Sequence, residues 1–229
     1  MRLRLLTVAV ACLAAPVAMA QDVTSDKGKV SYAVGYDLGR SLVDRGVDID
    51  PATLQRAIQD GLARKPPALP PQQLTQVLRV MQQRLLAQAK ADFDRAAANN
   101  KAASDRFIAQ NRAKPGVKTL ADGIQYRVIE DGNGPPVRAD GQVRIQYHAS
   151  ISTGQEFATS YTTPNAPPTT VVINESPLPG IKQVLPMMRQ GAHWEILLPP
   201  DQAYGSGPGS PIGPNQAVLF DIKIVDVGK

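Results

Sequence analysis

The stretch from residue 72 to residue 113 contains neither proline nor glycine, and this constrains the fold more than any other feature of the sequence. Its apolar residues keep helical spacing, in the series Leu74, Val77, Leu78, Met81, Leu85, Ala89, Phe93 and Ala97. One long helix over about residues 71–113 is therefore predicted. At 1.5 Å per residue it would be roughly 60 Å long, so short helices of the same chain cannot cover its apolar stripe. A second copy of the protein is the simplest cover, and a solvated spacer helix is the alternative.

Two shorter helices are predicted before it. Apolar residues recur every four positions from Val30 to Leu42, and again from Leu54 to Leu62 behind an Asp50-Pro51 start. Such spacing is typical of short amphipathic helices, and an aspartate followed by proline is a helix start signal. We therefore expect residues 21–114 to form a helical dimerisation domain.

The composition changes near Lys114-Pro115-Gly116, from a region rich in alanine, glutamine and leucine to one rich in glycine, proline and β-branched residues. Apolar and polar residues then alternate over residues 143–149 and 220–224, as in strands with one buried face. Residues 178–188, with Pro179 and Gly180 near their start, have room for only one short helix. The sequence therefore predicts an α+β fold, in which residues 115–229 form an antiparallel sheet wrapped around a short helix.

The first twenty residues have the layout of a signal peptide. Arg2 and Arg4 precede an apolar stretch that is too short to span a bilayer, and small residues end at Ala20. Cleavage there would remove Cys12, the single cysteine, which suits an oxidising compartment such as the periplasm. The alternatives are an outer-membrane lipid anchor on Cys12, and a location at the cell surface or outside the cell.

Several kinds of chemistry lack the residues that they require. Without Arg2 and Arg4, the 25 basic residues fall to 23 against 20 acidic ones, and a net charge of +3 is too mild to indicate nucleic-acid binding. Two histidines and no remaining cysteine argue against a zinc site or a Cys/His nucleophile. The glycine string at residues 205–209 opens no helix, so it does not fit a nucleotide fingerprint. Apolar and aromatic residues remain, and they suit a dry pocket.

An ordered set of motifs in the second part resembles the FKBP-type prolyl isomerases. The motifs are Gly123-Ile124-Gln125-Tyr126, Val143-x-Ile145-x-Tyr147, Gly154-x-x-Phe157, Leu178-Pro179-Gly180, Gly191-x-x-Trp194-Glu195-Ile196, Ala203-Tyr204-Gly205 and Pro211-Ile212-Gly213-Pro214-Asn215. The front part, with residues 29–39 and 111–117, is similar to the exported Mip-like (macrophage infectivity potentiator-like) subfamily, whose helical half forms a dimer.

The resemblance implies a proline pocket and assigns residues to it. The catalytic residues would be Tyr147, Phe157, Tyr204 and Phe220. The substrate-binding residues would be Val172, Pro177, Leu178, Ile181, Ala203 and Ile212. The hydroxyl group of Tyr204 would donate to a substrate carbonyl, and neither a metal nor a cofactor is needed. Strand parity alone leaves open that Tyr147, Phe157 and Phe220 are ordinary core residues.

Two positions depart from the family pattern. Ala158 stands where the family usually has an aspartate facing the pocket, and Ile181 stands where tryptophan usually forms its floor. Two hypotheses follow: a periplasmic isomerase of attenuated activity that assists exported proteins, or a dimeric holdase chaperone with little catalysis. The expected partners are proline-containing unfolded chains and a second copy. Macrolide inhibitors of the rapamycin class would bind more weakly because of Ala158.

Overall fold

The computed structural model describes residues 23–163 and 165–228. The predicted signal peptide, with Cys12, lies outside the described residues. The described chain divides into two compact units, one ending at Leu85 and the other beginning at Leu86. No helix among the described residues is both long enough and apolar enough to cross a membrane.

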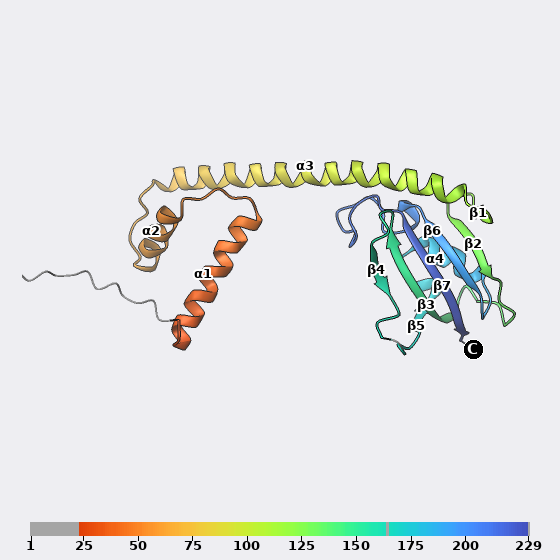
Figure 1. The fold of residues 1–229 in the computed structure, drawn as a ribbon. Coiled ribbons are helices and arrows are strands. Elements are labelled where there is room, and N and C mark those ends of the chain that lie inside the picture. Colours follow the sequence, from red (N-terminus) through yellow and green to blue (C-terminus); the bar gives the residue numbers. More distant parts are fainter. Residues whose placement is uncertain (1–22, 164, 229) are drawn as a thin grey trace, which may run out of the picture. The chain divides into compact units, whose positions relative to one another are not determined.

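The three predicted helices are present as α1 (Asp26–Asp44), α2 (Pro51–Leu62) and α3 (Pro71–Arg112) (Figure 1). The side chain of Ser25 accepts a hydrogen bond from the Gly28 amide at the start of α1. At the start of α2, the side chain of Asp50 accepts a 2.8 Å hydrogen bond from the Thr53 amide. These caps satisfy amides that the first helical turn leaves without partners. The local sequence therefore determines where α1 and α2 begin.

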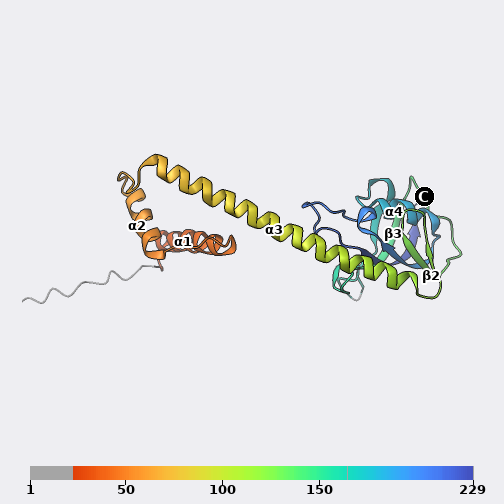
Figure 2. The same cartoon turned by 90° about the horizontal axis from the view of Figure 1, so that it is seen from above.

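The predicted antiparallel sheet has seven strands in the order β1-β2-β6-β7-β3-β4, with β5 paired to β3. The strands are β1 (Val117–Thr119), β2 (Gln125–Glu130), β3 (Gln142–Ile151), β4 (Glu156–Thr159), β5 (Thr169–Val172), β6 (His193–Leu198) and β7 (Val218–Val227). The predicted short helix is α4 (Pro179–Val184), which lies against the sheet (Figures 1 and 2). Short 3₁₀ turns occur at Ile173–Glu175, Leu185–Met187 and Pro200–Gln202. This is the predicted α+β arrangement.

The hydrophobic core lies between α4 and the inner face of the sheet. In β3, Val143, Ile145 and Ala149 are buried while Arg144 and His148 are exposed, as the alternation predicts. Close packing of α4 depends on a glycine, because a Cβ atom at Gly180 would collide with the side chain of Leu198 in β6. The core thus fixes α4 on the sheet, next to the cavity described below.

The predicted domain boundary near residue 114 falls at the end of α3, whereas the second compact unit begins inside that helix, at Leu86. The difference has a structural cause. The last turns of α3 form hydrogen bonds to the loop before β7 and to β2. A composition shift marks where the helix stops, but it carries no information about such tertiary contacts.

Candidate functional site

One cavity of about 410 Å³ opens at the edge of the core. Eight of the ten predicted site residues line it: Tyr147, Phe157, Val172, Pro177, Leu178, Ile181, Tyr204 and Phe220. The other two do not. Ala203 is buried immediately before Tyr204, and Ile212 packs on the margin of the core from the loop that follows Tyr204. The fold therefore gathers most of the predicted residues but leaves Ala203 and Ile212 outside the cavity lining.

Four aromatic rings surround the cavity in two pairs. Tyr147 on β3 and Phe220 on β7 have ring centroids 6.3 Å apart in a tilted arrangement. Phe157 on β4 and Tyr204, which follows the 3₁₀ turn at Pro200–Gln202, meet edge to face at 6.1 Å. Both separations lie within the range of favourable aromatic contacts. The rings therefore support one another and form a preformed apolar wall.

A β-bulge lets two consecutive residues of β4 face the cavity. Ala149 pairs with Ala158, while the next residue of β3, Ser150, pairs with Glu156, so Phe157 is left without a partner. Successive side chains of a regular strand point to opposite faces, and an extra residue in a bulge changes that direction. Phe157 and Ala158 consequently both line the cavity.

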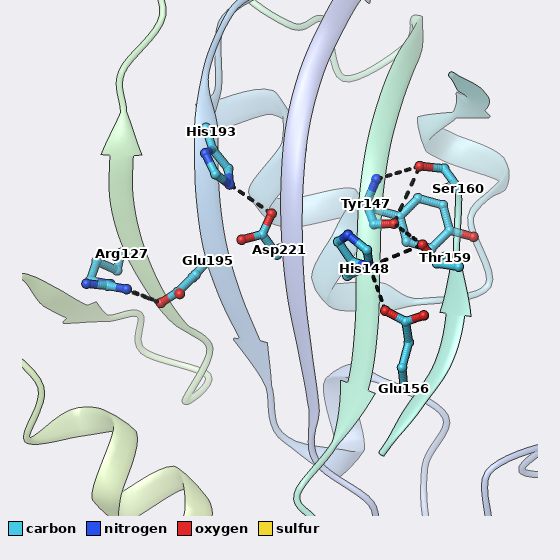
Figure 3. Close-up of polar contacts among 9 residues, drawn as sticks. All are labelled: Arg127, Tyr147, His148, Glu156, Thr159, Ser160, His193, Glu195 and Asp221. Carbon is cyan, nitrogen blue, oxygen red and sulfur yellow. Dashed lines mark hydrogen bonds and ion pairs between the residues drawn. The ribbon is translucent and has the colours of Figure 1, made fainter. Parts of the chain in front are cut away.

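The backbone of Tyr147 is held by two hydroxyl groups, one from the last residue of β4 and one from the residue after it (Figure 3). The Tyr147 amide donates to Ser160 Oγ at 2.8 Å, and Thr159 Oγ1 donates to the Tyr147 carbonyl at 3.2 Å. Ser160 is buried, which makes such bonds costly to break. Tyr147 is thus fixed relative to β4, which carries Phe157.

The floor of the cavity is aliphatic. Leu178 and Ile181 are both buried at the start of α4, where Pro179 occupies the first helical turn. A proline there needs no amide partner and its backbone angle suits a helix. The floor therefore offers apolar contact without the flat surface of an aromatic ring.

The hydroxyl group of Tyr204 has no hydrogen-bond partner among the described residues, and its side chain is partly buried. Burial raises the pKa of this phenol above its ordinary value, and Tyr147 raises it further. The group therefore stays protonated at neutral pH, so it can donate a hydrogen bond to a ligand in the cavity.

Both histidines lie away from the cavity, on the outer side of the sheet (Figure 3). His148 contacts Glu156 at 2.6 Å and stacks on Tyr161, whereas His193 contacts Asp221 at 2.8 Å. Among residues 23–163 and 165–228, no cluster of three or more histidine, cysteine or acidic side chains is suited to hold a metal ion. The cavity thus offers apolar contacts and hydrogen-bond donation.

Ala158, which stands where the family's aspartate would face the pocket, does line the cavity. Sequence reasoning did not assign seven other residues that line it: Ile145, Thr169, Thr170, Val171, Glu175, Ser176 and Ile222. Alternation in β3 and β7 would have found Ile145 and Ile222. The β-branched run Thr169–Val172 signals a strand, but its place beside β3 is a matter of tertiary pairing. Glu175, which is exposed, is the one carboxylate among these lining residues.

Comparisons with known proteins agree with this geometry. Residues 27–128 match the domain amino terminal to FKBP-type peptidyl-prolyl isomerase, and residues 134–225 match the FKBP-type peptidyl-prolyl cis-trans isomerase. Outer membrane protein MIP of Legionella longbeachae is 35% identical over 100% of this chain and 99% of its own length. Peptidyl-prolyl cis-trans isomerase Mip of Coxiella burnetii is 31% identical over 90% of this chain and 88% of its own.

A solved structure extends the likeness to three dimensions. The crystal structure of FkpA from Escherichia coli aligns with a TM-score of 0.67 at 30% identity, covering 89% of this chain and 97% of that one. Motifs, fold and relatives thus point to one family over both parts of the sequence. The chain belongs to the FKBP-type peptidyl-prolyl cis-trans isomerases, as a member that resembles Mip and FkpA.

Proposed function

We propose that the chain is an exported, dimeric prolyl isomerase of the periplasm that assists the folding of exported proteins, with attenuated activity. The substrate proline would enter the cavity between the ring pairs Tyr147/Phe220 and Phe157/Tyr204. The observation that carries this proposal is a cavity lined by four aromatic rings, with a partnerless phenol at its edge.

The proposed mechanism needs no acid, base or covalent step. Rotation about the bond before proline must cross about 18–20 kcal/mol, because amide resonance keeps that bond planar. An apolar cavity offers little stabilisation to the charge-separated planar form. Tyr204 would donate to a substrate carbonyl, and only a contact that is stronger in the twisted state raises the rate.

Attenuation is inferred from Ala158 and Ile181. Ala158 lines the cavity, where the family usually presents an aspartate, and its methyl group offers neither charge nor acceptor. Ile181 keeps the floor apolar but lacks the ring of the usual tryptophan. Binding without preferential stabilisation of the twisted amide lowers KM without raising kcat. We therefore expect proline-containing chains to bind and to isomerise slowly.

The test compares wild type with Ala158→Asp and Ala158→Asn in an isomerisation assay on a proline-containing peptide. Asparagine has nearly the shape of aspartate without its charge. Ala158→Asp should raise kcat by at most about tenfold, equivalent to about 1.4 kcal/mol. It should also tighten binding of a rapamycin-class macrolide, and Ala158→Asn should do neither. The attenuation proposal fails if wild type already turns over as fast as a family member that has the aspartate.

The second candidate function is a holdase, and the exposed apolar surface of α1 favours it. Val30 and Val34 are 63% and 65% exposed in one chain. Such surface marks interaction sites, for a second copy or for unfolded polypeptide. An aggregation assay on an unfolded protein, beside the isomerase assay, separates the two functions. If a Tyr204→Phe/Phe157→Ala double variant has lost isomerase activity but still suppresses aggregation of the unfolded protein, the holdase is favoured.

Export is supported by the N-terminal sequence and by the name of the Legionella relative, an outer membrane protein. Mass spectrometry of the protein from the cell envelope would test it. A chain beginning at Gln21 is expected, whereas a lipidated N-terminal Cys12 would indicate the anchored form.

A further inference from the structure

The last half of α3 presents a partly buried face that belongs to the same compact unit as the cavity. Residues on this face recur every three or four positions, as on one side of a helix. The partly or fully buried residues are Phe93, Ala96, Ala97, Asn100, Ala103, Ser104, Phe107, Ile108 and Asn111. Beside the apolar Phe93, Phe107 and Ile108, the face carries small and polar residues. The polar ones bring hydrogen-bonding groups close to the loop before β7.

Ser104 is the centre of this contact. Its side chain has no exposed surface, and it makes two hydrogen bonds to the end of that loop. Ser104 Oγ donates to the Asn215 carbonyl at 2.8 Å and accepts from the Ala217 amide at 2.8 Å. A buried hydroxyl group is costly unless it is paired, and here it satisfies two backbone groups of another segment.

Two further bonds hold the same loop end against α3. Asn100 Nδ2 donates to the Pro214 carbonyl at 2.9 Å, and Asn215 Nδ2 donates to the Ala97 carbonyl at 3.1 Å. Asn215 has a φ of 57°, which is unusual for a residue other than glycine. The bonds to α3 therefore offset the cost of an unfavourable backbone conformation.

Asn215 also connects to the cavity. Its amide donates to the Gly205 carbonyl at 3.1 Å, which closes the loop immediately after Tyr204. A continuous path thus runs from Ser104 on α3, through Asn215 and Gly205, to Tyr204. Because a hydrogen-bond donor must lie within a few tenths of an ångström of its working position, support of the loop base bears on what Tyr204 can do.

We propose that Ser104 and Asn215 are positioning residues for prolyl isomerisation, which act by holding the loop that begins after Tyr204. The end of α3 is then part of the structure that supports the site, in addition to joining the two halves of the chain. The inference rests on the proposed role of Tyr204 and adds to it the residues that set its position.

A double-mutant cycle in the full-length protein tests this. Ser104→Ala should lower kcat about two- to tenfold with a smaller change in KM, the range expected for loss of one hydrogen bond. In a Tyr204→Phe background the same substitution should lower kcat by less than about twofold, because effects that act through one group are not additive. Glycine at position 215 tolerates the positive φ but cannot make the side-chain hydrogen bond to Ala97. Asn215→Gly should therefore also lower kcat, by a smaller factor than Ser104→Ala.

Asn111→Ala is the matched control. Asn111 is also a buried polar residue of α3, but its Nδ2 donates to Gln125 Oε1 on β2 at 3.0 Å and not to the loop. It should destabilise the protein to a comparable degree and leave kcat unchanged. A rate that follows stability in all these variants would mean that Ser104 is merely structural.

The outcomes distinguish the two proposals. If Tyr204→Phe leaves kcat unchanged, the proposed role of Tyr204 fails and the positioning inference fails with it. If Tyr204→Phe lowers kcat but Ser104→Ala and Asn215→Gly do not, or if the losses multiply in the double variant, the positioning inference alone is overturned. If Ser104→Ala does not fold, the same double-mutant cycle with Asn215→Gly in its place tests the positioning inference.

Discussion

The two compact units of the described chain treat their apolar residues in different ways. In the unit that ends at Leu85, no residue of α1 or α2 is buried. In the unit that begins at Leu86, Val143, Ile196 and Ile222 have no exposed surface. Burial of apolar side chains is favourable in both units. The apolar side chains of α1 and α2 would therefore gain free energy if another surface covered them. A second copy is the occupant that we propose, which would make the stability of the first unit dependent on protein concentration.

The largest effect should come from a charge in the exposed face of α1. We expect Val34→Glu to convert a dimer to a monomer, because an unpaired charge in an apolar interface costs several kcal/mol. The mass in solution measures this. Arg40→Ala, which shortens an exposed side chain of the same helix, is the control and should remain dimeric. If the wild-type protein is itself monomeric, the long helix is a solvated spacer, and a second copy does not explain why the apolar residues of the first unit are exposed.

A pair of isoleucines makes the comparison quantitative. Ile196→Ala in the core should lower the free energy of unfolding by about 2–5 kcal/mol, regardless of protein concentration. Ile58→Ala in α2, where Ile58 is 42% exposed, should cost less, and its cost should depend on concentration because it acts through the proposed dimer. Urea unfolding at two protein concentrations tests both. Equal, concentration-independent losses would contradict the division of roles.

A smaller effect is expected from the phenol at the cavity. Tyr204→Phe should lower kcat/KM about two- to tenfold, since it removes one hydrogen bond of about 0.5–1.5 kcal/mol without changing core volume. An unchanged melting temperature would show that the fold is intact. A variant with wild-type kcat/KM would remove Tyr204 from the site.

The pH dependence of the rate follows from the raised pKa of Tyr204. Burial favours the protonated phenol in the folded state, so its contribution to stability is present below the ordinary value of 10.0 and is lost as pH rises through the higher folded-state pKa. Titration of this group should therefore leave the isomerisation rate unchanged at neutral and mildly alkaline pH, where the phenol stays protonated. A decline of the rate is expected only above pH 10.0, where the phenol loses its proton, and Tyr204→Phe should remove it, which rate measurements extended above that pH would detect.

The smallest effect concerns Glu175 at the cavity edge. Glu175→Gln should weaken a preference for peptides with lysine next to proline by less than about 1 kcal/mol, and added salt should diminish that preference in wild type. Ratios of kcat/KM for lysine- and alanine-containing peptides measure it. Glu156→Gln, on the outer face beside His148, is the control. The same change in both variants would indicate a general effect of charge.

Local patterns were sufficient for the helices and strands. The spacing of Val30 and Val34, the absence of proline and glycine from residue 72 to 113, and the alternation in β3 predicted helices and strands that the structure contains. The family motifs predicted eight residues that now line one cavity. The predictions of helices and strands succeed because the periodicity of each kind of element is visible in residues that are close in sequence. The eight cavity residues came from the family motifs, and their role in the site stays a prediction.

Tertiary structure alone decided the rest. Gln125 lies between apolar neighbours and would face outward by alternation, yet it is buried because its side chain bonds to Asn111 and to the Ile108 carbonyl of α3. Ile212 lies outside the cavity lining, and Ser104 reaches a loop more than a hundred residues away. Such contacts depend on which segments meet after folding, and periodicity records only the face that a residue occupies on its own element.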